Sequence, residues 1–300
     1  MAMKTPVRRC RANCLFEASS SAPARHASVM RWLGYNETRS SEQRNLVSSK
    51  PGAGRFFAAT AGVIRQQGRS MLAAAPWSLA VFTLSLPFAL ADTPLYQLTD
   101  LVFVALTLIN LIAFARMTFA WHRTVVLGNI PRDTTARGGT AEAKHLVLLA
   151  ALAIAVAALG RATGDLPFVV YVLLNGAEDI RFWAALIAST AIIWLPVLYA
   201  LATYGLSLPR VATTGEYGFG HIRAAMPYPR WPLMLMLLAL VVVAGFTASV
   251  LSPLTYTFVT GADVAYAALG VVLSVLATFV VTAMYAVAYR DATGRAGESA

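Results

Sequence analysis

The side chains with the greatest capacity for chemistry in this 300-residue chain are arginines and histidines near the ends of long apolar segments. Arg116 and Arg123 lie seven residues apart, so they share one face of a helix. A guanidinium group binds phosphate or carboxylate through two parallel hydrogen bonds, and nearby imidazoles supply further polar atoms. We therefore predict a candidate cluster for a phosphate, a lipid headgroup or an acidic partner, formed by Arg116, His122, Arg123, Arg210, His221 and Arg223. The alternative is that these arginines only anchor the ends of helices, with their charged groups reaching water.

Groups that typically catalyse reactions are scarce in the sequence. It contains no H-E-x-x-H zinc motif, no G-x-S-x-G nucleophile elbow and no phosphate-binding P-loop. Cys10 and Cys14 are the only cysteines, and they form a C-x3-C pair with no histidine close by, so we predict free thiols rather than a metal site. We expect no enzymatic activity, no cofactor and no metal. An enzyme that acts on lipid headgroups is the least favoured alternative.

The elements that must position the cluster are long apolar helices. Hydrophobic residues make up 58% of the chain and charged residues 13%, whereas a soluble domain carries about 25% charged residues. About 20 apolar residues in a helix cross a bilayer core about 30 Å thick, and lipid cannot satisfy open backbone groups, which favours helices. We predict an all-α, polytopic membrane protein, with a six-helix transmembrane bundle over residues 71–290. Its spans are expected at about 71–91, 101–121, 145–160, 182–206, 231–251 and 264–289.

Several residues within these segments predict how the helices pack. Asn110 is expected to form a hydrogen bond between helices rather than to bind a substrate, and Gly270 lies among alanines that allow close approach of helices. Trp121 and Tyr289 are expected in an aromatic belt at the membrane interface. The short apolar stretch Leu166–Gly176 predicts a surface or re-entrant segment on the outer side, or else an extension of the neighbouring hairpin.

The distribution of basic residues predicts the orientation of the chain. Of the 24 Lys and Arg residues, 22 fall on one side of the six spans, and the other side holds only Arg161 and Arg181 beside six acidic residues. The positive-inside rule then places both termini in the cytoplasm. The net charge of +10 indicates topology and attraction to anionic lipids of the cytoplasmic leaflet. It does not indicate nucleic-acid binding, for which no motif is present.

The N-terminal segment is unlike the rest of the chain. Residues 1–52 are poor in apolar residues and rich in Ser and Arg, which predicts a disordered basic tail. Two alternatives are an organellar transit peptide and a true start of the protein at Met30. Residues 53–70 are expected to form a juxtamembrane interfacial helix with Arg65 and Arg69 at the headgroups. The residues expected to face lipid are Phe56, Phe57, Val63 and Ile64. Residues 291–300 are expected to form a cytoplasmic tail.

One motif carries a resemblance to a known family. Residues 117–128 read MTFAWHRTVVLG, and this Trp-His-Arg junction resembles that of a broad family of uncharacterised six-span bacterial inner-membrane proteins. That family is distantly similar to the membrane domain of some glycerophosphodiester phosphodiesterases. Leu206-Ser207-Leu208-Pro209 keeps a fragment of a second family motif, whereas residues 226–231 depart from a third. The resemblance covers about residues 71–290 and implies a six-helix bundle. It brings no catalytic residues, because the soluble phosphodiesterase domain has no counterpart in this sequence.

These observations favour a non-enzymatic inner-membrane protein that acts as a scaffold or subunit. Its basic cytoplasmic loops are expected to contact anionic lipid, a second copy of the chain or another membrane-complex partner. The alternative is a small transporter or permease-like subunit that receives an anionic or lipid ligand at Arg116, Arg123 and Arg210.

Overall fold

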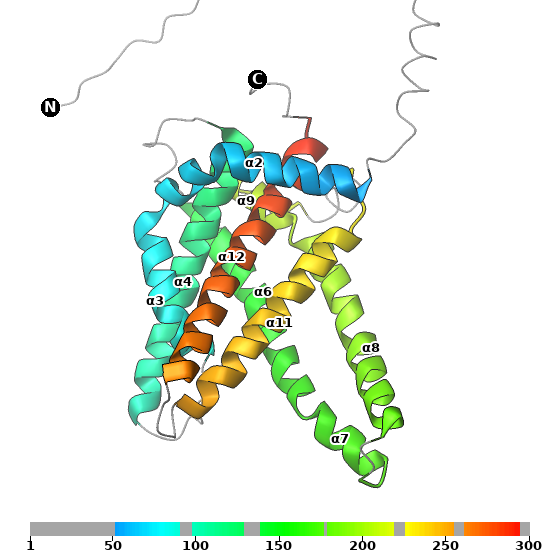
Figure 1. Ribbon diagram of the computed structural model, residues 1–300. Helices are drawn as coiled ribbons and strands as arrows, with labels where there is room; N and C mark the ends of the chain where they lie inside the picture. The colour runs from blue at the N-terminus through cyan, green and yellow to red at the C-terminus, as the bar shows by residue number, and fades with distance from the viewer. Residues whose placement is uncertain are drawn as a thin grey trace, which may run out of the picture. The chain divides into compact units, whose positions relative to one another are not determined.

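The computed structural model describes residues 52–90, 98–128, 139–176, 179–218, 226–254 and 261–294, all within one unit of the chain, Lys50–Ala300. The described residues form helices and no strand, which confirms the expected all-α class. The helices are α2 (Ala53–Ala74), α3 (Pro76–Leu90), α4 (Leu98–Leu127), α6 (Thr140–Gly164), α7 (Leu166–Leu173), α8 (Ile180–Tyr204), α9 (Ser207–Thr214), α11 (Trp231–Leu254) and α12 (Gly261–Ala292) (Figure 1).

Within these described ranges, five helices are long and apolar enough to cross a membrane. They comprise Leu101–Leu127, Thr140–Leu173, Ile180–Thr214, Trp231–Leu251 and Val264–Ala292. The number rises to six if α2 and α3 together make one crossing, and these two helices meet at a bend of 85°. The chain is therefore a multi-pass helical membrane protein.

The first expected span, residues 71–91, is not one helix. Helix α2 continues to Ala74, and α3 starts at Pro76 after the bend. Proline is favoured in the first turn of a helix, where its missing N–H group is not needed. In Figure 1, α2 lies across one end of the bundle, over the ends of α4 and α12, and it packs against both.

The orientation of α2 corrects a prediction. Phe56 and Val63 were expected to face lipid, but they are buried with Thr60 and Met71 against the bundle. The positions recur every three or four residues, so they form one stripe of the helix. Phe57 and the arginines Arg65 and Arg69 lie on the exposed part of α2. The sequence correctly predicted an amphipathic helix here, but the apolar stripe of α2 packs against protein rather than against lipid.

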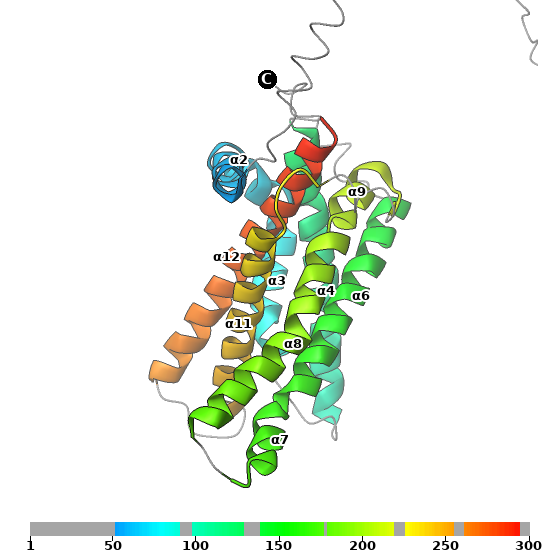
Figure 2. The same ribbon diagram turned by 90° about the vertical axis from the view of Figure 1, so that its right-hand side faces the viewer.

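The stretch Leu166–Gly176 extends a hairpin rather than forming a separate surface segment. Helix α7 follows α6 directly, and the two together make one apolar run of 34 residues, Thr140–Leu173. Helix α7 then packs against α8 (Figure 2). Asp179 starts α8 by accepting hydrogen bonds from the backbone N–H groups of Arg181 and Phe182.

The core joins α2, α3, α4, α8, α11 and α12. Helices α3 and α4 pack closely side by side, and Asn110 of α4 donates hydrogen bonds to the Phe82 carbonyl at 2.9 Å and to Ser85 Oγ at 3.0 Å. The expected interhelical role of Asn110 is thus confirmed. Gly270 of α12 approaches Thr247 of α11 so closely that an added Cβ would lie 2.4 Å from its hydroxyl oxygen, which confirms the expected close approach.

Two aromatic residues expected at the membrane interface belong to the core instead. Trp121 is fully buried and packs edge-on against Phe279 of α12, with ring centroids 5.0 Å apart. Tyr289 is also buried. By contrast, Trp77, Trp183 and Trp231 are exposed.

Candidate functional site

The predicted cluster lies where α4, α6 and α9 meet, at the same end of the bundle as α2 in Figures 1 and 2. His145 of α6 is fully buried at the centre of this junction. Its Nε2 atom lies 3.1 Å from Thr118 Oγ1 on α4, and its Nδ1 atom lies 3.3 Å from the Leu208 carbonyl oxygen on α9. A carbonyl only accepts, so Nδ1 carries the proton when the ring is neutral. The Thr118 hydroxyl lies within hydrogen-bond distance of both Nε2 and the Phe114 carbonyl oxygen. One imidazole therefore connects three helices.

His122 is buried beside this ring. The rings of His122 and His145 meet edge to face, with centroids 5.7 Å apart. Phe119 packs edge-on against His145 at 5.6 Å, and the Arg123 guanidinium lies over the Phe119 ring at 5.5 Å. The Trp-His-Arg motif of the chain is thus a packing element: Trp121 contacts α12, His122 contacts α6, and Arg123 lies along its own helix.

His145 was not among the predicted site residues. Its position at the start of an apolar segment suggested a place near water, whereas the structure buries it completely. The signal that could have identified it is its apolar surroundings, because a histidine followed by Leu-Val-Leu-Leu rarely lacks a specific polar partner.

Arg116 forms an ion pair with Glu142 of α6, with 2.9 Å between Arg116 Nε and Glu142 Oε1. The Arg116 side chain is 61% exposed and that of Glu142 is 26% exposed. The pair borders a hollow of about 270 Å³ between α4 and α6, which is open to the outside. The lining residues are Ile112, Ala115, Arg116, Gly139, Glu142, Ala143 and Leu146. Most of the wall is apolar, and both charges lie in it.

Arg210 of α9 has a different acidic partner. Its Nη2 atom lies 3.5 Å from Glu216 Oε2, and its guanidinium packs close to the Gly218 backbone. Lys144 of α6 donates a 2.9 Å hydrogen bond to the carbonyl of Gly215, the left-handed residue that ends α9. These contacts fasten the turn after α9 to the start of α6. His221 and Arg223 lie outside the described residues.

The structure therefore divides the predicted cluster into separate contacts. Arg116 pairs with Glu142, Arg210 pairs with Glu216, and His122 is part of the buried packing around His145. Nδ1 of His122, Nε1 of Trp121 and Oγ of Ser207 are buried without a hydrogen-bond partner among the described residues. In the same ranges, no three His, Cys, Asp or Glu side chains lie together as metal ligands would.

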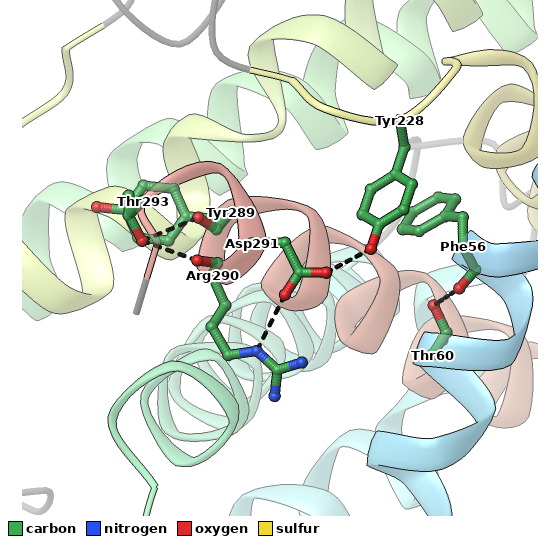
Figure 3. Close-up of polar contacts among 7 residues, drawn as sticks. All are labelled: Phe56, Thr60, Tyr228, Tyr289, Arg290, Asp291 and Thr293. Atoms are coloured by element: carbon green, nitrogen blue, oxygen red, sulfur yellow. Dashed lines mark hydrogen bonds and ion pairs between the residues drawn. The ribbon is translucent and has the colours of Figure 1, made fainter. Parts of the chain in front are cut away.

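A second polar group fastens the C-terminal end of α12 to α2 (Figure 3). The Tyr228 hydroxyl donates a 2.5 Å hydrogen bond to Asp291 Oδ2, and Arg290 Nε lies 3.3 Å from Asp291 Oδ1. The Tyr228 ring stacks on Phe56 of α2 at 4.6 Å. Burial, and then the hydrogen bond to the Asp291 carboxylate, raise the pKa of Tyr228 to about 12. The segment before α11 thus connects α2 with the end of α12 at one end of the bundle.

Comparison with known proteins found no relative of this chain. No protein-family model, no curated protein and no solved structure matches the chain. The class of the protein accordingly follows from its apolar helices alone: it is a helical multi-pass membrane protein.

Proposed function

We propose that this chain is a non-enzymatic protein of the bacterial inner membrane that acts as a scaffold or subunit. Both termini would lie in the cytoplasm, and the basic side of the bundle would contact anionic lipid or a membrane-complex partner. The observation that carries the proposal is the use of interior polar side chains to join helices. Asn110 joins α4 to α3, His145 joins α6 to α4 and α9, and Tyr285 of α12 donates a 2.7 Å hydrogen bond to the Leu201 carbonyl of α8.

An apolar outer surface supports the same proposal. The hairpin of α6, α7 and α8 exposes large aliphatic and aromatic side chains along its length, among them Val147, Ile154, Phe168, Ile187 and Ile192. Lipid or another membrane protein must cover such a surface. The hairpin packs on the rest of the bundle mainly through α6 against α4 and α9 and through α8 against α11, whereas α7 packs mainly on α8 and α6. The α7 end of the hairpin would therefore be available to a partner.

The basic side offers a second contact surface. Arg55, Arg65 and Arg69 are exposed on α2, which lies across the end of the bundle. Anionic headgroups attract each Lys or Arg near the membrane surface by about 1 kcal/mol. Helix α2 would therefore hold this end of the protein at the cytoplasmic surface of the membrane.

The orientation can be tested with single cysteines in a background that carries Cys10→Ser and Cys14→Ser. Arg181→Cys, in the first turn of α8, should react with a membrane-impermeant maleimide in intact cells. Gln66→Cys on the exposed part of α2 should react only after lysis. Labelling of both positions in intact cells, or the reverse pattern, would show that the proposed orientation is wrong.

The scaffold role is tested separately by what the protein does in isolation. Purification of the full chain in mild detergent should recover a second copy, a partner protein or bound anionic lipid, detected by native mass spectrometry. Liposomes that contain the protein should not pass phosphate or other small anions faster than empty liposomes. Rapid anion flux, with no copurifying partner or lipid, would favour the transporter alternative and reject the scaffold.

A further inference from the structure

We propose that the hollow between α4 and α6 binds the headgroup of a zwitterionic aminophospholipid, a lipid that carries both a phosphate and a primary ammonium group. This inference depends on the membrane location of the chain but not on the scaffold role. The site would place the phosphate at Arg116 and the ammonium at Glu142, the two charged groups that line the hollow.

Both charged groups keep hydrogen-bonding capacity beyond their ion pair. The ion pair brings Nε of Arg116 to 2.9 Å from Oε1 of Glu142, and the Arg116 side chain is 61% exposed. A guanidinium carries five N–H donors and a carboxylate has about four acceptor positions, so the Nη groups and Oε2 retain donors and acceptors for a ligand. Arg116 Nη groups suit two phosphate oxygens, and Glu142 Oε2 suits an N–H of the ammonium.

The start of α6 adds a further favourable element. Gly139 lines the hollow directly before α6, and it has no side chain with which to cap the helix. The first N–H groups of a helix lack partners within the helix and carry partial positive charge, which favours an anion. A phosphate at Arg116 would therefore also lie near the positive end of α6.

The shape and lining of the hollow favour a lipid over a free ion. Ile112, Ala115 and Leu146 supply apolar wall next to the charges, and Ile112 is half exposed on the outer surface of α4. The volume of about 270 Å³ lies just below the range of about 300 to 1,000 Å³ typical of small-molecule pockets. It suits a headgroup, whose acyl chains would then continue along the exposed apolar surface of α4 and α6.

The depth of the hollow also agrees with a headgroup. Phe88 packs against Phe103, and Phe82 against Phe114, with centroids 6.0 and 5.2 Å apart. Extending this antiparallel register places Pro76, the first residue of α3 after the bend from α2, level with about Thr118 of α4. The exposed Arg65 and Arg69 place α2 at the level of the headgroups, and Arg116 is only two residues away from Thr118.

The presence of both charges distinguishes the expected lipid from other phospholipids. Glu142 would repel a purely anionic headgroup. A choline headgroup carries a quaternary ammonium without N–H groups, so it cannot donate a hydrogen bond to the carboxylate. We therefore expect phosphatidylethanolamine to bind more tightly than either phosphatidylglycerol or phosphatidylcholine.

The test is a competition among short-chain phospholipids for the full chain in mild detergent. Native mass spectrometry would count bound dihexanoyl phosphatidylethanolamine, phosphatidylcholine and phosphatidylglycerol. Wild-type protein should prefer the ethanolamine lipid over the choline lipid by roughly ten-fold, which corresponds to one charge-assisted hydrogen bond. Glu142→Gln should remove that preference but keep phosphate binding, and Arg116→Ala should weaken binding of all three lipids.

Two further variants keep the test decisive. Arg69→Ala removes an exposed arginine from α2 and should leave the lipid preference unchanged. If Arg116→Ala does not fold, Arg116→Lys keeps the charge but removes the two-pronged phosphate contact, and it should still reduce binding. Equal binding of the ethanolamine and choline lipids by wild type, an unchanged preference in Glu142→Gln, or a preference for phosphatidylglycerol would each overturn the proposal. None of these results depends on whether the protein acts as a scaffold.

Discussion

Helices α11 and α12 approach each other closely at Gly270, and replacement of this glycine by alanine should separate them. The added Cβ atom would lie 2.4 Å from Thr247 Oγ1 and 3.1 Å from both Thr247 Cβ and Cγ2. Rotation of the threonine side chain could move Oγ1 away, but it would break the hydrogen bond to the Val243 carbonyl and would leave Thr247 Cβ 3.1 Å from the added atom. The helices must therefore shift apart, and such overpacking costs about 1–3 kcal/mol.

A matched control isolates this cost from helix propensity. Alanine stabilises a helix by about 1 kcal/mol relative to glycine, so Gly270→Ala alone would combine a gain and a loss. Gly245 of α11 has no atom within 4 Å of its added Cβ, so Gly245→Ala should show the gain only. Comparison of the two variants cancels the propensity and leaves the packing cost.

The assay is thermal unfolding of both variants in the same detergent, followed by tryptophan fluorescence. A change of 1 kcal/mol shifts Tm by about 2–4 °C for a domain of 150–250 residues, so Gly270→Ala should unfold about 2–12 °C below Gly245→Ala. Adding Thr247→Ala should restore much of the loss, because the Thr247 hydroxyl bonds only to the Val243 carbonyl of its own helix among the described contacts. Equal Tm values for the two glycine variants would refute the proposed close contact, and an absence of rescue would show that Thr247 is not its cause.

Three other replacements test the polar connections between helices. His145→Leu leaves the Leu208 carbonyl without its partner and should lower the free energy of unfolding by about 1–3 kcal/mol; unchanged denaturant stability would contradict the three-helix role. Asn110→Leu should cost about 0.6 to 2 kcal/mol and loosen α3, measured as faster proteolysis within that helix; an unchanged cleavage rate would argue against the contact. Tyr228→Phe should lower stability by about 1 kcal/mol near neutral pH. Because the folded pKa of Tyr228 is raised from 10.0 to about 12, the stabilisation is complete below about pH 10 and falls as pH rises toward 12. The stability difference between wild type and Tyr228→Phe should therefore shrink over that interval, and a constant difference would contradict the assigned cause.

Hydropathy predicted the apolar helices well, because a run of about 20 apolar residues has few other uses. It could not predict which face of a helix meets protein, since lipid tails are as apolar as a protein core. This is why Phe56 and Val63 of α2, and Trp121 of α4, were assigned to lipid or to the interface although they are buried. Single polar residues such as Asn110 were predictable, because an isolated amide in a membrane needs a partner on another helix.

At the candidate site, too, the sequence predicted the arrangement along one helix but not the contacts between helices. Spacing along one helix predicted that Arg116 and Arg123 share a face, but it contains no information on the neighbouring helix. The contact of Arg116 with Glu142 arises only when α6 packs antiparallel to α4. The third span was expected to begin at residue 145, whereas α6 begins at Thr140 and carries Glu142 in its first turn, where a negative side chain is favoured.

The bend between α2 and α3 bears on how many times the chain crosses the membrane. Helix α3 has 15 residues and is about 22 Å long at about 1.5 Å per residue, which is about 8 Å less than the hydrocarbon core. The buried stripe of α2 packs on α4 and α12 at the end of the bundle. The bent pair of α2 and α3 together is long and apolar enough to make one crossing. Helix α2 and the end of α12 pack together at one end of the bundle. An even number of crossings would keep these two elements on one side of a membrane, whereas five crossings would place them on opposite sides.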